Sequence, residues 1–336
     1  MPLPSDEQVV RDSTEVVSTL HKIFGEHPGI RPGEIQSPNS FRVRINALIA
    51  HGKGILINGN FTPSAEAGKL SSAPHFNNPS TPITVRFSDS TGLPNIPDND
   101  PNADPRGMAI RFHLATHPKR VHTDIVCHST PFFPVRTGAE FLEFFKAVAS
   151  SPPGGPSPSP VEKFVGARPY TLAFVQAPKP APSSYAREEY FSVTAFKLID
   201  ANGKETTIRY RIVPALGVET VDPEELKGKD PNYLQKDIAA RLQEGPVTFH
   251  LVAQIAEAGD IVNDATVRWP ETRPLIELGS VKLGSVAQDQ AKEQKYTIFD
   301  PIPRVKGVEA SDDPLLEFRA AVYLISGRER RAAPAL

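Results

Sequence analysis

Short runs with the character of β-strands recur along this chain, and clusters of turn-forming residues separate them. Runs of this length, rich in Val, Ile, Thr and Phe and bounded by Gly, Pro, Asn or Asp, are typical of strands. Seven or eight of them, mostly antiparallel, predict a closed barrel. The clearest runs lie at residues 54–61, 83–90, 107–114, 124–133, 187–200, 204–215 and 246–257.

Four further segments repeat apolar residues at helical spacing, and each follows a residue that can cap a helix. The segments and their expected N-caps are 5–25 with Ser5, 137–150 with Thr137, 230–245 with Asp230, and 313–330 with Asp313. Between the runs 187–200 and 204–215, an Asn-Gly pair predicts a hairpin.

Proline accounts for 35 of the 336 residues, which is about twice its usual ~5% share. This favours rigid loops and extended arms over long helices. We therefore expect an α+β fold, a closed antiparallel eight-stranded β-barrel with peripheral helices. We expect one domain over 1–336, with an N-terminal helix and arm at 1–40 and a Pro/Ser/Gly-rich loop at 151–160.

Charge and cysteine content exclude several classes of protein. The net charge is -2, without a basic region that would indicate nucleic acid or an anionic membrane. Cys127 is the single cysteine, so no internal disulfide can form. No apolar run approaches the ~20 residues of a membrane span, and no leader is visible, so we expect a soluble, cytoplasmic protein. The oligomeric state stays open, a homo-oligomer included.

Two features of the sequence could carry chemistry. His51 precedes the first strand, and it is either a hydrogen-bonded core histidine or a group that faces a ligand and moves protons. Arg319 and Tyr323 lie four residues apart on one helical face. They are either an ordinary surface pair or a phenol that the neighbouring cation keeps ionised as a metal ligand. The residues alone favour the ordinary interpretation of each.

Several segments together resemble the catalases. TPITVRFSDSTG and DPRGMAIRFHL resemble the active-site segment of that family, and DIVCHSTPFFPVR resembles the segment that follows it. NDATVRWPETRPLIELGSVKL and RAAVY match later family segments, in the same order, over about residues 40 to 330. The chain lacks the long wrapping arm and the C-terminal additions of large catalases, and so looks like the small catalase-related haem peroxidases.

The resemblance implies a haem b site and assigns roles within it. His51 falls at the distal acid-base histidine and Ser88 at the serine that orients it. The iron ligand would be Tyr323. Other haem contacts would come from Phe141 by stacking, from Arg319 as the charge partner of the ligand, and from Arg86 and Arg330 at the propionates.

The chain departs from the family pattern near the distal histidine. Leu48 replaces the first propionate arginine, for which Arg42 or Arg44 could substitute, and Ala50 replaces a valine. His128 replaces the distal asparagine that positions peroxide, and it is either a distal group or a satisfied core histidine.

We therefore expect a haem-dependent peroxidase that cleaves hydrogen peroxide or an organic peroxide and oxidises a small organic donor, with weak or no catalase activity. Histidine is suited to both proton transfers because its unperturbed pKa is near ~6.5. Two alternatives stay open: a fatty-acid hydroperoxide-converting enzyme on the same fold, and a non-catalytic haem-binding protein.

Overall fold

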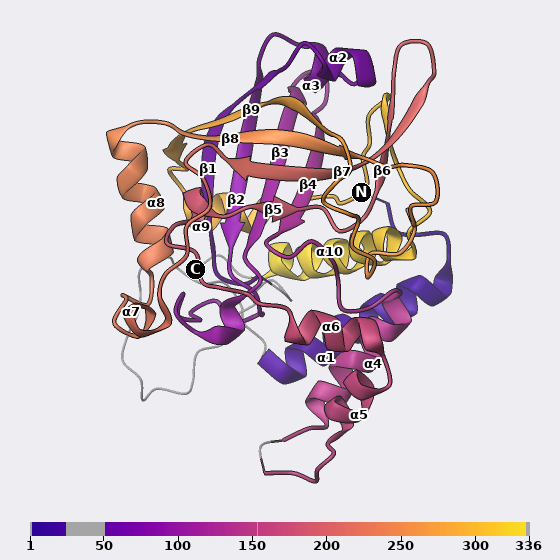
Figure 1. Ribbon diagram of the computed structural model, residues 1–336, viewed down its shortest axis with the longest axis vertical. Coiled ribbons are helices and arrows are strands. Elements are labelled where there is room, and N and C mark those ends of the chain that lie inside the picture. The colour runs from indigo at the N-terminus through magenta and orange to yellow at the C-terminus, as the bar shows by residue number, and fades with distance from the viewer. Residues whose placement is uncertain (1, 25–50, 153, 334–336) are drawn as a thin grey trace.

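The computed structural model describes residues 2–24, 51–152 and 154–333, and its centre is a closed β-barrel (Figure 1). Within these ranges, eight antiparallel strands close the ring in the order β1-β2-β3-β4-β5-β7-β8-β9, and β9 pairs back onto β1. This confirms the predicted eight-stranded barrel. The strands are β1 Gly54–Pro63, β2 Thr81–Ser88, β3 Gly107–Ala115, β4 Val121–His128, β5 Tyr190–Phe191, β7 Glu205–Pro214, β8 Val247–Ile255 and β9 Leu275–Val286.

Two of the predicted runs need correction, and two strands, β9 and β10 (Val308–Ala310), lie outside all the predicted runs. The run 187–200 is not one strand: it forms β5 and then β6 (Phe196–Ile199), which pairs with β7 as the expected Asn-Gly hairpin. β10 extends the sheet beyond β6. The run 124–133 ends at His128, because the side chain of that residue accepts the backbone N–H of Thr130 and turns the chain.

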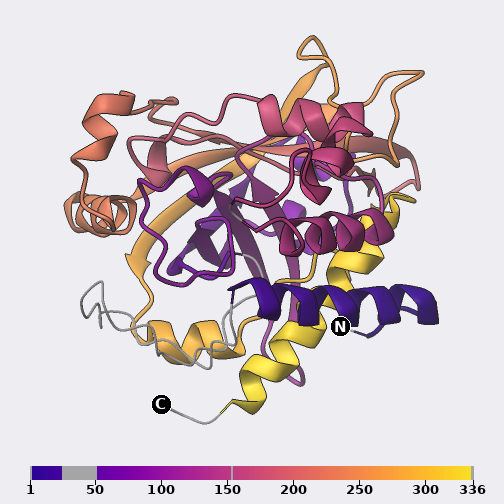
Figure 2. The ribbon, with the colours of Figure 1, turned by 90° about the horizontal axis from the view of Figure 1, so that it is seen from below.

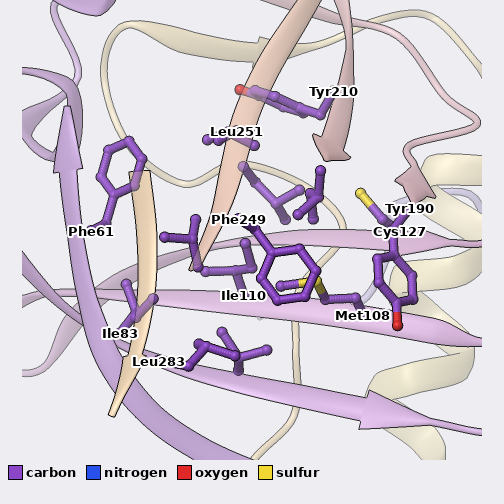
Figure 3. Close-up of a cluster of buried hydrophobic side chains, with 14 of the residues drawn as sticks. Phe61, Ile83, Met108, Ile110, Cys127, Tyr190, Tyr210, Phe249, Leu251 and Leu283 are labelled. Carbon is purple, nitrogen blue, oxygen red and sulfur yellow. The ribbon is translucent and has the colours of Figure 1, made fainter. Parts of the chain in front are cut away.

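The barrel interior is a continuous apolar core, and Figure 3 shows part of it. Side chains alternate between the two faces of a strand, so every second residue of β2, β3 and β4 points inward. Phe87, Met108 and Cys127 are buried in this cluster and belong to neighbouring strands in register. Their neighbours Ser88, Gly107 and His128 must therefore lie on the outer face of the barrel.

Three helices pack together outside the barrel. α1 (Glu7–Phe24) contacts both α4 (Gly138–Ala149) and α10 (Pro314–Ala332), and Figure 2 shows α1 crossing α10. A second apolar cluster joins the three helices. The other helices are α2 Ala67–Leu70, α3 Pro74–Asn77, α5 Pro160–Gly166, α6 Pro169–Gln176, α7 Pro223–Lys227, α8 Tyr233–Glu244 and α9 Gln290–Tyr296. None of the helices in the described ranges is long and apolar enough to cross a membrane.

The helix caps follow the sequence with two differences. Thr137 and Asp313 cap α4 and α10 as expected. The cap of α1 is Asp6 and not Ser5, because Oδ1 of Asp6 accepts the N–H of Gln8 at 2.7 Å. Asp230 accepts the N–H of Asn232 in the turn before α8, so that helix begins two residues later than predicted.

Candidate active site

One cross-strand row on the outer face of the barrel holds several of the predicted site residues. Gly54 of β1 is paired with Ser88 of β2, Ser88 with Gly107 of β3, and Gly107 with His128 of β4. Directly opposite residues of antiparallel strands project from the same face. Ser88 and His128 therefore lie on one surface, on either side of a residue that has no side chain.

The imidazole of His51 fills the space above Gly107. A Cβ at Gly107 would lie 3.0 Å from Nδ1 of His51 and 2.6 Å from Oγ of Ser88. The Ser88 hydroxyl lies 3.2 Å from the same imidazole nitrogen. The structure thus brings His51 and Ser88 together, and Gly107 is a site residue that the sequence analysis missed. Its position at the start of a strand in DPRGMAI was the available signal.

The backbone of His51 adopts an uncommon conformation. Its φ angle is 59°, in the left-handed region that non-glycine residues seldom occupy. The next residue is anchored, because the N–H of Gly52 donates to the carbonyl of Thr91 at 2.9 Å. Backbone strain of this kind concentrates at functional sites.

Burial keeps the His51 ring neutral. Desolvation, followed by the positive charge of Arg86 and more weakly that of Arg319, lowers the pKa of His51 to about 4, although Asp89 opposes the shift. The value lies below the ordinary ~6.5 that we used in the sequence analysis. At neutral pH the ring is therefore a proton acceptor.

His128 is buried at the other end of the row. Its Nδ1 accepts a hydrogen bond from the backbone N–H of Thr130 at 3.2 Å and lies 2.7 Å from the Thr130 hydroxyl. Its Nε2 has no hydrogen-bond partner in the part of the chain that the structure describes. Burial, then the charges of Arg319 and His51, lowers the pKa of His128 to about 3.

The helix α10 carries three of the predicted residues on one side. Nη2 of Arg319 donates to the Tyr323 hydroxyl at 3.4 Å, so the predicted face exists. The Arg319 charge also lowers the pKa of both His51 and His128. This part of α10 is therefore within electrostatic reach of the barrel row. Arg330 lies two further turns along the same helix, seven residues after Tyr323.

Arg86 and Arg330 both donate to residues in or next to α9, and neither forms an ion pair with a carboxylate of the described ranges. Arg86 donates to Oε1 of Gln294 at 3.1 Å and to the Gly52 carbonyl at 3.3 Å, and Arg330 donates to the Thr297 carbonyl at 2.7 Å. Nη1 of Arg330 is buried and has no partner among the described residues. Desolvation lowers the pKa of each guanidinium to about 10, and the Arg330 charge contributes to the shift at Arg86. Two buried cations with neutral partners favour an anion between them.

Phe141 stands between α10 and His128. Its ring stacks on Phe133 with centroids 5.8 Å apart, and it meets Phe318 of α10 edge-on at 5.8 Å. Phe133 is in turn 6.0 Å from the His128 ring. The aromatic residues thus connect α4 and α10 to the barrel row.

A buried ionic network lies behind the row, and sequence reasoning did not find it. Arg106 donates to Oδ1 of Asp89 and to the carbonyl of Asp98, each at 2.6 Å. The ammonium of Lys53 binds the Asp98 carboxylate, and Tyr185 donates to Asp89 at 2.7 Å. The network fixes the backbone beneath the site, because its members are close in sequence to site residues. Lys53 is two residues after His51, Asp89 follows Ser88, and Arg106 precedes Gly107.

Four residues named in the sequence analysis lie outside the described residues. They are Leu48 and Ala50, which depart from the family pattern, and Arg42 and Arg44, either of which could substitute for the arginine missing at Leu48. The other predicted residues form one connected group of ring contacts, hydrogen bonds and electrostatic interactions.

Comparison with solved structures identifies the class of fold. Catalase A from Saccharomyces cerevisiae superposes with a TM-score of 0.75, at 20% sequence identity, over 90% of this chain and 68% of that chain. A fungal catalase gives a TM-score of 0.74 at 22% identity, over 91% of this chain and 66% of that chain. The chain thus has the catalase fold and spans about two thirds of the length of these structures.

Sequence comparison shows the family. The model of the Catalase family matches residues 36–334. A catalase-related peroxidase of Mycolicibacterium paratuberculosis is 34% identical over 283 residues, which cover 83% of this chain and 88% of that protein. A catalase-related peroxidase of Synechococcus elongatus is 30% identical over 308 residues, covering 90% and 89% respectively. This protein belongs to the catalase family.

The site residues fit a haem. The orphaned Nη1 of the buried Arg330 can bind a carboxylate, and the charge of Arg330 acts on the buried guanidinium of Arg86. The glycine at position 107 gives His51 its place, and the Tyr323 hydroxyl has a cation beside it. An anionic oxygen ligand, paired arginines for propionates and a neutral imidazole are the donor set that a ferric haem with an open side requires.

Proposed function

We propose that this protein is a haem-dependent peroxidase that cleaves hydrogen peroxide or an organic peroxide while it oxidises a small organic donor. The single observation that carries the proposal is the placement of a neutral, buried His51 over Gly107, with its Nδ1 facing Ser88. This imidazole shares its surroundings with the Arg319–Tyr323 pair.

In this proposal, side chains from α10 and the barrel hold the haem. Tyr323 supplies the iron ligand, and Arg319 stabilises its phenolate as a hydrogen-bond donor. Arg86 and Arg330 would bind the propionates, and Phe141 would contribute an aromatic contact to the haem. When bound, the haem supplies the iron at which the peroxide O–O bond is cleaved.

His51 moves the protons. Its neutral ring accepts a proton from one peroxide oxygen and returns it to the other oxygen, which then leaves as water or an alcohol. The low pKa of the ring makes the protonated form a strong acid, so the second transfer is favourable. Ser88 holds Nδ1, so that Nε2, on the opposite edge of the ring, carries the exchange.

The relatives favour a peroxidase over the two alternatives. The two relatives described above are named catalase-related peroxidases, and this chain covers 88% and 89% of their lengths. Neither fatty-acid hydroperoxide conversion nor haem binding without turnover is favoured by a specific observation. We further propose haem b as the type of haem, a cytoplasmic location, and weak or no catalase activity. A reducing compartment is consistent with a single buried cysteine, Cys127.

An absorption spectrum of the purified protein tests the proposal. We expect a haem spectrum that changes when peroxide is added and returns when a phenolic donor is added. Oxygen release and donor oxidation would be measured on the same preparation. A protein that binds haem but leaves the peroxide concentration unchanged would overturn the proposal in favour of a binding protein.

A further inference from the structure

We propose that Thr130 is a positioning residue that fixes the tautomer of His128, so that His128 presents a permanent neutral Nε2–H donor to the peroxide. The inference deepens the proposed function and rests on it. It assigns a role to a residue that has no place among the predicted site residues, and it gives the histidine at the asparagine position a defined chemical state.

The hydrogen bonds at Nδ1 determine the tautomer. The backbone N–H of Thr130 lies 3.2 Å from Nδ1 of His128, and a backbone N–H can only donate. This hydrogen bond favours the tautomer in which Nδ1 carries a lone pair and no proton. The Thr130 hydroxyl, at 2.7 Å from the same nitrogen, can add a second donor. In a neutral imidazole the proton then resides on Nε2.

Nε2 of His128 is the ring nitrogen without a hydrogen-bond partner among the described residues. It is buried, and none of the described residues accepts a hydrogen bond from it. A buried donor without an acceptor costs free energy, and such groups in native proteins commonly face a ligand or an ordered water. His128 projects from the same barrel face as Ser88, one strand beyond the glycine above which His51 lies. An oxygen atom near His51 is the acceptor that this arrangement favours.

The charged and titratable groups around His128 keep it neutral. Arg319 of α10 and His51 both act against its protonation, and burial acts in the same direction, so its pKa falls to about 3. Phe133 covers one side of the ring without contributing charge. His128 thus does the hydrogen-bonding work of an amide N–H and does not titrate in the physiological range. His51 is left as the group that exchanges protons.

Fluoride binding to the ferric protein measures the donor. Fluoride accepts hydrogen bonds and undergoes no turnover, so its Kd and the wavelength of its charge-transfer band report the donors around it. His128→Phe removes the donor and should weaken fluoride binding about 10- to 100-fold, the value of a hydrogen bond to a charged acceptor. His128→Asn keeps a donor and should stay within about threefold of the wild type. Between pH 5 and 8, the Kd for fluoride should depend on pH in the same way in His128→Asn and in the wild type.

Variants of Thr130 test the positioning role. Thr130→Val keeps the backbone N–H and removes the hydroxyl, so we expect weaker fluoride binding and a broadened tautomer population. Thr130→Ser keeps a hydroxyl, so its fluoride affinity and its tautomer population should match those of the wild type. If Thr130→Val behaves as the wild type in both measurements, the Thr130 side chain does not position the ring and the proposed role of Thr130 is overturned.

Nitrogen NMR of histidine-labelled protein reads the tautomer directly. The spectrum would be recorded on the diamagnetic ferrous carbonyl form, and His128 would be assigned from the signal lost in His128→Asn. We expect an unprotonated Nδ1 and a protonated Nε2. A proton on Nδ1, or fluoride affinity in His128→Asn as low as in His128→Phe, would overturn the inference. A protein that carries no haem overturns the proposed function instead, and the NMR spectrum of the protein as purified still decides the tautomer.

Discussion

The hydroxyl oxygen of Ser88 lies 3.2 Å from Nδ1 of His51, although 37 residues separate them in sequence. The contact exists because Ser88 is paired with Gly107 across β2 and β3, and Gly107 has no Cβ to occupy the space. Three residues from three segments therefore define the position of one imidazole. The chemistry proposed for His51 depends on that position.

Replacing His51 with alanine should slow peroxide cleavage by at least ~100-fold, the lower range for a lost general acid-base. Haem content should be unchanged, because no proposed haem contact is removed. Stopped-flow absorbance after mixing with peroxide would give the rate. An unchanged rate at full haem loading would show that His51 is structural only. In the wild type, the rate should be constant above about pH 5 and fall as pH drops through the His51 pKa of about 4.

Replacing Tyr323 with phenylalanine should abolish or greatly weaken retention of ferric haem. The variant keeps the ring in the cluster of α1, α4 and α10, so the fold should survive, while the oxygen beside Arg319 is lost. Haem content per protein and the absorption spectrum are the measurements. Wild-type haem content with a wild-type spectrum would exclude Tyr323 as the iron ligand.

Replacing Arg330 with glutamine should weaken haem binding by about tenfold or more, since a charge-assisted hydrogen bond to a propionate contributes ~1.5–3 kcal/mol. Arg331→Gln is the matched control, because Arg331 follows Arg330 in the same helix and its side chain is exposed. Haem transfer to apomyoglobin would give the dissociation rates. Equal rates in both variants would remove Arg330 from the haem site.

The wild type should oxidise a phenolic or dye donor better than it releases oxygen from peroxide alone. Disproportionation needs a second peroxide held in a defined place, and an imidazole has a single N–H where an amide has two. His128→Asn should therefore raise oxygen release relative to donor oxidation. Fast oxygen release by the wild type with negligible donor oxidation, unchanged in the variant, would identify an ordinary catalase.

Three buried histidines should each lower the free energy of unfolding as the pH falls from about 6.5 toward 4, and His75 allows one of these contributions to be measured. Burial lowers the pKa of His51 to about 4 and that of His75 and His128 to about 3, so the unfolded chain binds more protons at these three residues in this range. Burial raises the pKa of Asp98 to about 7 and that of Glu188 to about 8, and these carboxyl groups act in the opposite direction. Each such group contributes at most ~1.4 kcal/mol per pH unit. Urea titrations at pH 7.5 and 5 would measure the change. His75 packs on Phe76 and Phe112 away from the site. On going from pH 7.5 to 5, the unfolding free energy of His75→Leu should therefore rise relative to that of the wild type. An equal change in the two proteins contradicts the expectation.

The sequence predicted the barrel because its strands carry local signals. Alternating apolar residues and the Asn-Gly pair at residues 202–203 identify strands and one hairpin without knowledge of the rest of the chain. The division of 187–200 into β5 and β6 was not predictable in the same way. It depends on Ser192, whose N–H donates to the Tyr210 carbonyl at 2.9 Å across the sheet.

The resemblance could propose a set of residues for the site but not their arrangement. Motif resemblance proposed His51, Ser88 and Tyr323 by position. Three other features arise from strand register and loop closure. They are the space over Gly107 that the His51 ring fills, the hydrogen bonds from Thr130, and the ionic network around Arg106. These long-range contacts leave no periodic signal in the chain.

The inner face of the barrel wall forms the apolar core, and the outer face carries the candidate site. β2, β3 and β4 place Phe87, Met108 and Cys127 inside, while their immediate neighbours Ser88, Gly107 and His128 face the site. Stability and chemistry are thus encoded at alternate positions of the same strands, with the sheet between them. Interior substitutions that conserve the volume of Phe87, Met108 and Cys127 should leave the outer positions in place, because volume-conserving changes are the best tolerated in a packed core. A library that repacks the interior could then be selected for thermal tolerance with the reaction chemistry held constant.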